Sequence, residues 1–88
     1  MKMTGNYILR YAAGANWLVK ADQQDADYVA PLMINEVGAV IWKGIEAGYK
    51  ASEITILLQN SYQIHLEEAK SDVEEFLEQL QKCNIITA

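Results

Sequence analysis

The sequence predicts a single α+β domain, in which a small three-stranded antiparallel sheet precedes three helices in a winged-helix-like order. In the first third of the chain, short runs rich in aromatic and β-branched residues are typical of strands. In the rest, apolar residues recur at the three- and four-residue spacing of amphipathic helices. Strands grouped before helices favour an α+β domain over a doubly wound parallel sheet. The 88 residues suffice for one small core, so we expect residues 1–88 to form one domain.

The first two predicted strands form a hairpin. The runs NYILRYA and NWLVKA are joined by AGA, where Gly14 can adopt the positive φ of a tight turn. Alternation along the first run places its residues on opposite faces of the sheet. Tyr7, Leu9 and Tyr11 lie on one face, and Ile8 and Arg10 on the other.

The third predicted strand lies in YVAPLMI, residues 28–34, after the acidic loop DQQDAD. Pro31 has no N–H to donate, so we expect it at the start of a strand or at the edge of the sheet. This strand runs directly into a helix, with Asn35 alone at the junction. Asparagine is a favoured N-cap because its side-chain oxygen accepts from a free N–H of the first helical turn.

The first predicted helix begins near Glu36, whose carboxylate suits the positive end of a helix, and Gly48 is placed to end it. Gly38 costs about 1 kcal/mol of helix stability relative to alanine, which indicates that its backbone closely approaches a neighbouring element. Trp42 lies at the rim of the apolar stripe, and we expect its indole to pack against the sheet. The stripe itself consists of Val37, Val40, Ile41 and Ile45.

Two further helices follow. Asn84 can adopt the left-handed conformation that closes the last of them, so we expect Ile85 and Ile86 to fold back onto the core. Cys83, in the last turn, is expected to be half-buried. The apolar stripe of the second helix is Ile54, Leu57, Leu58 and Tyr62, and that of the third, which begins after His65, is Leu66, Ala69, Val73, Phe76, Leu77 and Leu80.

Charge is distributed unevenly along the chain. Residues 1–20 carry three cations and no acid, whereas all twelve carboxylates come later, half of them between Glu67 and Glu78. The net charge of −5 opposes contact with nucleic-acid phosphates, whose neutralisation by lysine and arginine dominates such binding. A winged-helix DNA-binding regulator is therefore disfavoured. Most carboxylates of the third predicted helix lie off its apolar stripe and are best explained as a solvated face.

Candidate catalytic residues are sparse. His65 is the single histidine and Cys83 the single cysteine, and neither has nearby in sequence the partners that metal sites or nucleophiles require. We therefore expect a binding module without enzyme activity, metal or cofactor. Apolar runs fall far short of the roughly 20 residues of a membrane span, and the N-terminus lacks a signal-peptide core. These features predict a cytoplasmic protein.

The stretch from Ile34 to Leu80 resembles the PqqD family, small peptide-binding proteins of ribosomal peptide natural-product pathways that are also called RiPP recognition elements. The family pattern L-N-E-T-G-A-x-I-W is similar to INEVGAVIW, and D-V-x-x-F-L-x-x-L to DVEEFLEQL at residues 72–80. The segment YILRYAAG also resembles the family's first strand and turn. The departures affect helix ends: Val37 and Lys50 stand where threonine is usual, and Asn84 where a glycine often closes the third helix.

The resemblance implies both a function and its partners. Family members bind the leader segment of a precursor peptide as an added strand, in a groove between the third strand and the third helix. They present this peptide to a modifying enzyme, often a radical S-adenosylmethionine protein with iron–sulfur clusters, with a lasso-type protease and cyclase as the alternative. The site residues implied for this chain are Val29, Pro31, Leu32, Met33, Ile34, Asp72, Phe76 and Gln79.

The sequence leaves several alternatives open. The opposite flank of the third helix, with Lys70, Glu74 and Gln81, could line the groove instead. A second copy of the chain could cap an open strand edge, giving a homodimer or a strand swap. The chain could also be a structural subunit without affinity for peptides.

Overall fold

Strands β2 (Tyr7–Ala12) and β3 (Ala15–Lys20) form the predicted hairpin in the computed structural model, which describes residues 2–21 and 29–87. Ala13 and Gly14 connect them with φ angles of 53° and 76°. Two successive residues with positive φ are the mark of a type I′ turn, whose twist matches that of the flanking strands. The turn is thus one residue shorter than predicted. The predicted loop DQQDAD and Tyr28 lie outside the described residues.

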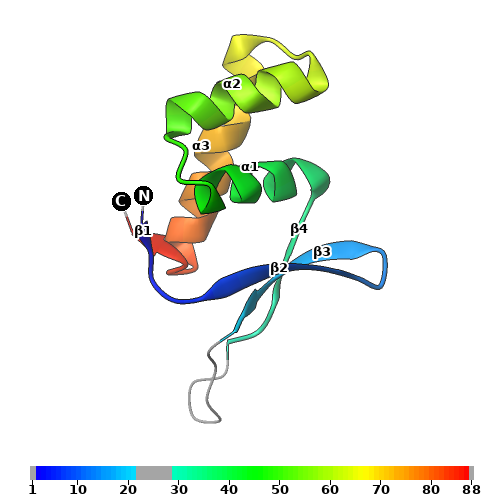
Figure 1. Cartoon of the computed structure of the whole chain (residues 1–88), viewed down its shortest axis with the longest axis vertical. Helices are drawn as coiled ribbons and strands as arrows, with labels where there is room; N and C mark the ends of the chain where they lie inside the picture. The colour runs from blue at the N-terminus through cyan, green and yellow to red at the C-terminus, as the bar shows by residue number, and fades with distance from the viewer. Residues whose placement is uncertain (1, 22–28, 88) are drawn as a thin grey trace.

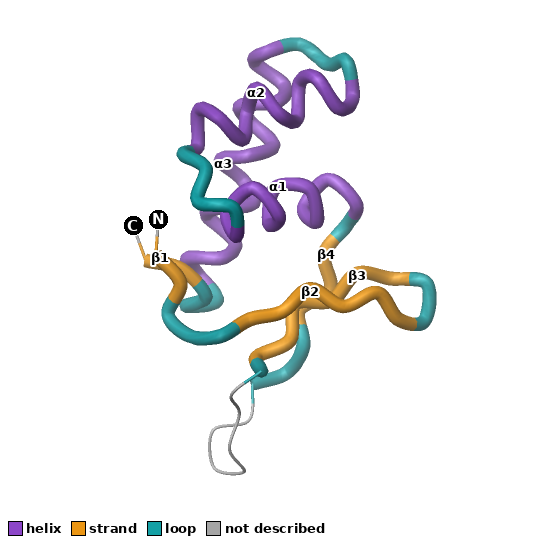
Figure 2. Tube along the Cα trace, in the orientation of Figure 1, coloured by secondary structure: helices purple, strands orange, loops and turns teal. Residues whose placement is uncertain are grey.

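Strand β4 (Leu32–Ile34) pairs antiparallel with β3, so the sheet has the order β2-β3-β4. The strand is shorter than the predicted 28–34. It begins immediately after Pro31, which is exposed and has no N–H for a ladder. Figures 1 and 2 show β4 leading from this sheet directly into the helices.

Three helices follow, α1 (Glu36–Glu46), α2 (Ala51–Tyr62) and α3 (Leu66–Lys82), which confirms the α+β prediction. The Asn35 side-chain oxygen accepts from the Gly38 N–H at 2.7 Å, as expected of the N-cap of α1. Gly48, with a φ of +83°, follows the end of α1. The helices pack together on one side of the sheet (Figure 1). Among the described residues, no helix is long and apolar enough to cross a membrane.

A second sheet joins the two ends of the chain and was not predicted. Strand β1 (Lys2–Met3) pairs antiparallel with β5 (Ile86–Thr87), and the Thr4 N–H donates to the Ile85 carbonyl at 3.0 Å. Asn84 adopts the expected left-handed conformation with a φ of 58°. Ile85 and Ile86 are buried, which confirms that the chain folds back onto the core.

The core lies between the helices and the inner face of the sheet. Its largest fully buried side chains are those of Trp42, Leu18, Ile41, Ile54, Leu58, Leu80 and Val73. Trp42 was expected at the rim of its stripe, but its indole is completely buried. Tyr62 and Leu66 were predicted to lie on apolar stripes but are exposed, because they are the last residue of α2 and the first of α3. Cys83, at the C-cap of α3, is exposed rather than half-buried.

Gly38 confirms the predicted close approach. A Cβ at this position would lie 2.8 Å from Cε1 of Phe76, on α3. Such a contact is shorter than van der Waals distance, so no larger residue fits without displacing the ring. The absence of a side chain at Gly38 therefore sets how closely α1 and α3 pack beside β4.

We predict that Gly38→Ala lowers the free energy of unfolding by about 1–2 kcal/mol, because overpacking outweighs the better helix propensity of alanine. In a Phe76→Leu background the same substitution should cost less, since the smaller side chain gives way. Denaturant unfolding of the two single variants and the double variant measures this coupling. An equal cost of Gly38→Ala in both backgrounds would contradict the packing explanation.

Candidate functional site

The open edge of β4 is defined by the register of the sheet. Antiparallel pairs alternate between residues that exchange main-chain hydrogen bonds and residues that do not. In the hairpin, the Ala21 N–H donates to the Asn6 carbonyl at 2.7 Å. Bonded pairs recur at every second position of the register, so Trp17 also exchanges main-chain hydrogen bonds with Arg10 on β2. The main-chain groups of Trp17 therefore face β2, and those of its two neighbours face β4.

Met33 lies opposite Trp17 in the β3–β4 register. Its N–H and C=O consequently point away from β3, toward an edge where no further strand pairs within the described part of the chain. Asn35, the next residue with the same orientation, already uses its carbonyl to accept from the Ala39 N–H at 3.0 Å. The edge thus presents Met33 as a main-chain donor and acceptor, and it ends where α1 begins.

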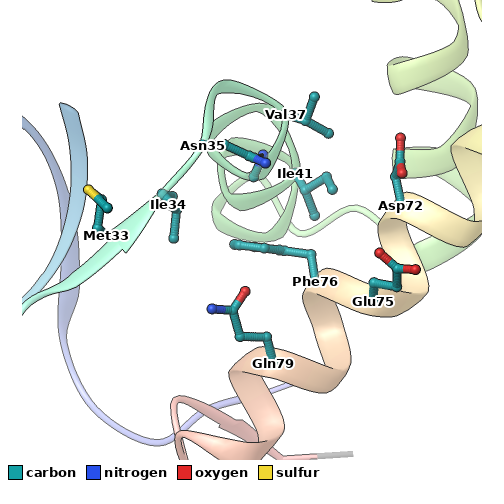
Figure 3. Close-up of a pocket in the computed structure, with 10 residues that line it drawn as sticks. Met33, Ile34, Asn35, Val37, Ile41, Asp72, Glu75, Phe76 and Gln79 are labelled. Atoms are coloured by element: carbon teal, nitrogen blue, oxygen red, sulfur yellow. Dashed lines mark hydrogen bonds between the residues drawn. The ribbon is translucent and has the colours of Figure 1, made fainter. Parts of the chain in front are cut away.

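A groove of about 340 Å³ runs along this edge, between β4 and the start of α1 on one side and α3 on the other (Figure 3). In this view, the side chains of Ile34 and Phe76 point into the space between β4 and α3. The groove is lined by Met33, Ile34, Asn35, Val37, Gly38, Ile41, Asp72, Glu75, Phe76 and Gln79.

The structure brings five of the eight predicted site residues together in this groove: Met33, Ile34, Asp72, Phe76 and Gln79. The other three, Val29, Pro31 and Leu32, precede or begin β4 and do not line it. Of the two flanks of α3, the groove is lined by the one with Asp72, Phe76 and Gln79. Lys70, Glu74 and Gln81 are absent from its walls.

The sequence analysis missed five residues that line the groove: Asn35, Val37, Gly38, Ile41 and Glu75. Four of them are the N-cap of α1 and residues of its first half, which were considered for their capping and packing alone. Glu75 was assigned to the solvated face of α3, and it is indeed exposed. Its position three residues after Asp72 and four before Gln79 places it on the same side of the helix. The helical spacing of Glu75 could therefore have identified it as a residue of the groove.

The groove is apolar at its floor and negatively charged along α3. Ile41 and Phe76 are buried, and Val37 is half-buried. Asp72 is half-buried and Glu75 exposed, and no salt bridge or hydrogen bond engages either carboxylate within residues 2–21 and 29–87. Within the part of the chain that the structure describes, no lysine, arginine or histidine lines the groove. A ligand of complementary chemistry would be partly apolar and partly cationic.

The described residues contain no group of three or more histidine, cysteine, aspartate or glutamate side chains that could hold a metal ion. The geometry is that of a binding groove with one open main-chain edge.

A second hollow of about 530 Å³ lies on the other side of the end of β4, against the tip of the hairpin. It shares Met33, Ile34 and Asn35 with the first groove and adds residues such as Tyr11 and Asn16. Both sides of the junction between β4 and α1 are therefore accessible from outside.

Comparison with known proteins agrees with this geometry. The family model of PqqD, described as coenzyme PQQ synthesis protein D, matches residues 25–86. A solved structure, "TbiB1 in Complex with the TbiA(beta) Leader Peptide", superposes with a TM-score of 0.76 and 19% sequence identity, covering 97% of this chain and 93% of that one. No match was found among curated protein sequences.

We predict that Asn35→Ala lowers the free energy of unfolding by about 1 kcal/mol, because Asn35 caps the helix that begins where the strand edge ends. Lys50→Ala is the matched control. Lys50 is the N-cap of α2 and its side chain makes no capping hydrogen bond, so that variant should change stability by less than about 0.5 kcal/mol. Chemical denaturation measures both, and an equal loss in the two variants would contradict the role of the Asn35 cap.

Proposed function

The chain belongs to the PqqD family, and on this premise we propose that it binds the leader segment of a ribosomally made precursor peptide as an additional strand on β4. The bound segment lies in the groove beside α3, and the chain presents the peptide to a modifying enzyme. The observation that carries this proposal is the orientation of Met33, whose N–H and C=O face the groove instead of β3.

Strand addition suits a groove of this shape. An extended peptide can pair with an exposed sheet edge through main-chain hydrogen bonds, while pockets for alternate side chains provide specificity. Here the groove places the apolar side chains of Ile34, Ile41 and Phe76 beside the edge, where those pockets are needed. The protein of similar fold, TbiB1, was solved with a leader peptide bound, which supports the same class of ligand for this chain.

Magnitudes indicate how affinity divides between main chain and side chains. A net gain of about 0.5–1.5 kcal/mol per hydrogen bond gives the two bonds at Met33 a contribution of about 1–3 kcal/mol. Micromolar binding requires about 8 kcal/mol. Burial of apolar side chains, at about 1.5–3 kcal/mol each, must supply much of the difference. The edge therefore fixes the register of the peptide, and the groove provides most of the affinity and selectivity.

The modifying enzyme is a separate partner in this proposal. The described residues contain no group of three or more histidine, cysteine, aspartate or glutamate side chains that could hold a metal ion, and in this proposal the chemistry belongs to the enzyme that receives the peptide. Family resemblance favours a radical S-adenosylmethionine enzyme as that partner, with a lasso-type protease and cyclase as the alternative.

We predict that Met33→Pro weakens binding of a synthetic peptide with the leader sequence of the chain's cognate precursor by about tenfold or more, because proline removes the N–H at the open edge. Met33→Ala keeps that N–H and should bind within about threefold of the unmodified chain, since only side-chain contacts are lost. Calorimetric titration measures both affinities, and circular dichroism checks that both variants fold. Equal binding by Met33→Pro and the unmodified chain would contradict strand addition at β4.

A further inference from the structure

We infer that the groove selects peptides in which an apolar side chain and a lysine or arginine stand two residues apart, on the same face of the bound strand. This inference rests on the proposed function and deepens it by stating which leader chemistry the site recognises. It follows from three observations: the orientation of the β4 edge, the division of the groove into an apolar and an acidic part, and the spacing of residues on α3.

The edge determines which side chains of the guest enter the groove. A guest residue directly opposite Met33 has its own side chain on the same face of the sheet as Met33, since directly paired residues share a face. The two neighbours of that guest residue point to the opposite face. That face carries Ile34, which is buried against the helices. Alternate guest side chains therefore point toward α3.

The apolar part of the groove receives one of these side chains. Ile34, Val37, Ile41 and Phe76 meet at its floor, and Figure 3 shows the Phe76 ring lying between β4 and the body of α3. Gly38 adds no side chain that would fill this space, and a methyl group there would instead press on Phe76. An aliphatic or aromatic guest side chain opposite Ile34 would enter this part of the groove.

The acidic part lies on the N-terminal side of Phe76 on α3. Asp72 stands on the side of Val37 and Ile41, away from Met33, and Glu75 is next to it on the helix (Figure 3). Neither carboxylate has a cationic partner among the described residues, where the one salt bridge recorded joins Lys82 and Glu78 at 3.1 Å. The groove lining, as far as residues 2–21 and 29–87 form it, includes no cation to balance them. Of the side chains of a peptide, those of lysine and arginine are cationic throughout the neutral pH range and complement this wall.

The spacing of the two parts matches an extended peptide. Asp72 precedes Phe76 by one turn of α3, which is a rise of about 6 Å at 1.5 Å per residue. Two residues of a strand span about 6.6 Å. A guest strand that continues beside α3 past the position opposite Ile34 would bring one side chain over Phe76 and a second one, two residues away on the same face, to the Asp72 carboxylate. A cation one or three residues away would point out of the groove.

Selection from a displayed library of random 12-residue peptides tests the inference without a known ligand. Against the unmodified chain, the enriched peptides should carry lysine or arginine two positions from an aromatic or aliphatic residue. An enriched peptide, made synthetically, should bind Asp72→Asn/Glu75→Gln about five- to tenfold more weakly at low salt, and the difference should shrink as added salt screens the charges.

A matched control uses Glu67→Gln/Glu74→Gln, which removes the same charge from α3 outside the groove and should bind within about twofold of the unmodified chain. Enriched peptides that lack a cation at this spacing, or equal binding by the two double variants, would overturn the inference while leaving strand addition intact. Peptides that bind Met33→Pro as tightly as the unmodified chain, or the absence of any enriched peptide, would count against the proposed function itself.

Discussion

The pairing of β4 with β3 is the constraint on which the rest of this molecule depends. It places Leu18 and Asn16 opposite Leu32 and Ile34. The N–H and C=O groups of those two β4 residues therefore form hydrogen bonds with β3. Met33 is left with its N–H and C=O on the outer edge. A shift of one residue in this register would exchange the two faces of the strand. Ile34 would leave the core, and the N–H and C=O of Met33 would no longer lie on the open edge.

The junction between β4 and α1 turns this edge into a groove. Asn35 ends the strand and caps the helix with one side-chain hydrogen bond, so the chain turns with no connecting loop. The first turn of α1 then stands beside the open edge, and the contact between Gly38 and Phe76 draws α3 close to it. Backbone orientation, an apolar floor and an acidic wall thus come from three elements, each held by an interaction with its neighbour.

Much of this architecture could be predicted from the sequence because local signals agreed with the tertiary structure. The hairpin turn at Gly14, the cap at Asn35 and the close approach at Gly38 each follow from what a single residue can do. The β1–β5 sheet could not be predicted in this way, because each strand has two residues and their pairing joins positions more than 80 residues apart. Periodicity also misplaced Leu66 and Tyr62, since it does not show where packing against a neighbouring helix stops.

The candidate site was predictable in outline from family resemblance. The motif at residues 72–80 contained Asp72 and Phe76, but sequence spacing alone did not decide which flank of α3 faces the strand. The wall of the groove that α1 contributes depends on the tertiary contact between Gly38 and Phe76. The sequence indicated a close approach at Gly38, but it did not show that Phe76 is the neighbour. The exposed Glu75 illustrates the same difficulty, because a carboxylate on a solvated face and a carboxylate on the wall of an open groove have the same pattern in sequence.

Amide hydrogen exchange at Met33, followed residue by residue by NMR, tests the central claim most directly. In the free protein the Met33 N–H should exchange faster than those of Leu32 and Ile34, which face β3. Addition of a saturating leader peptide should slow exchange at Met33 markedly and change it far less at its two neighbours. If the peptide binds while exchange at Met33 stays as fast as in the free protein, the guest does not pair with this edge, and the account of β4 as the binding strand is wrong.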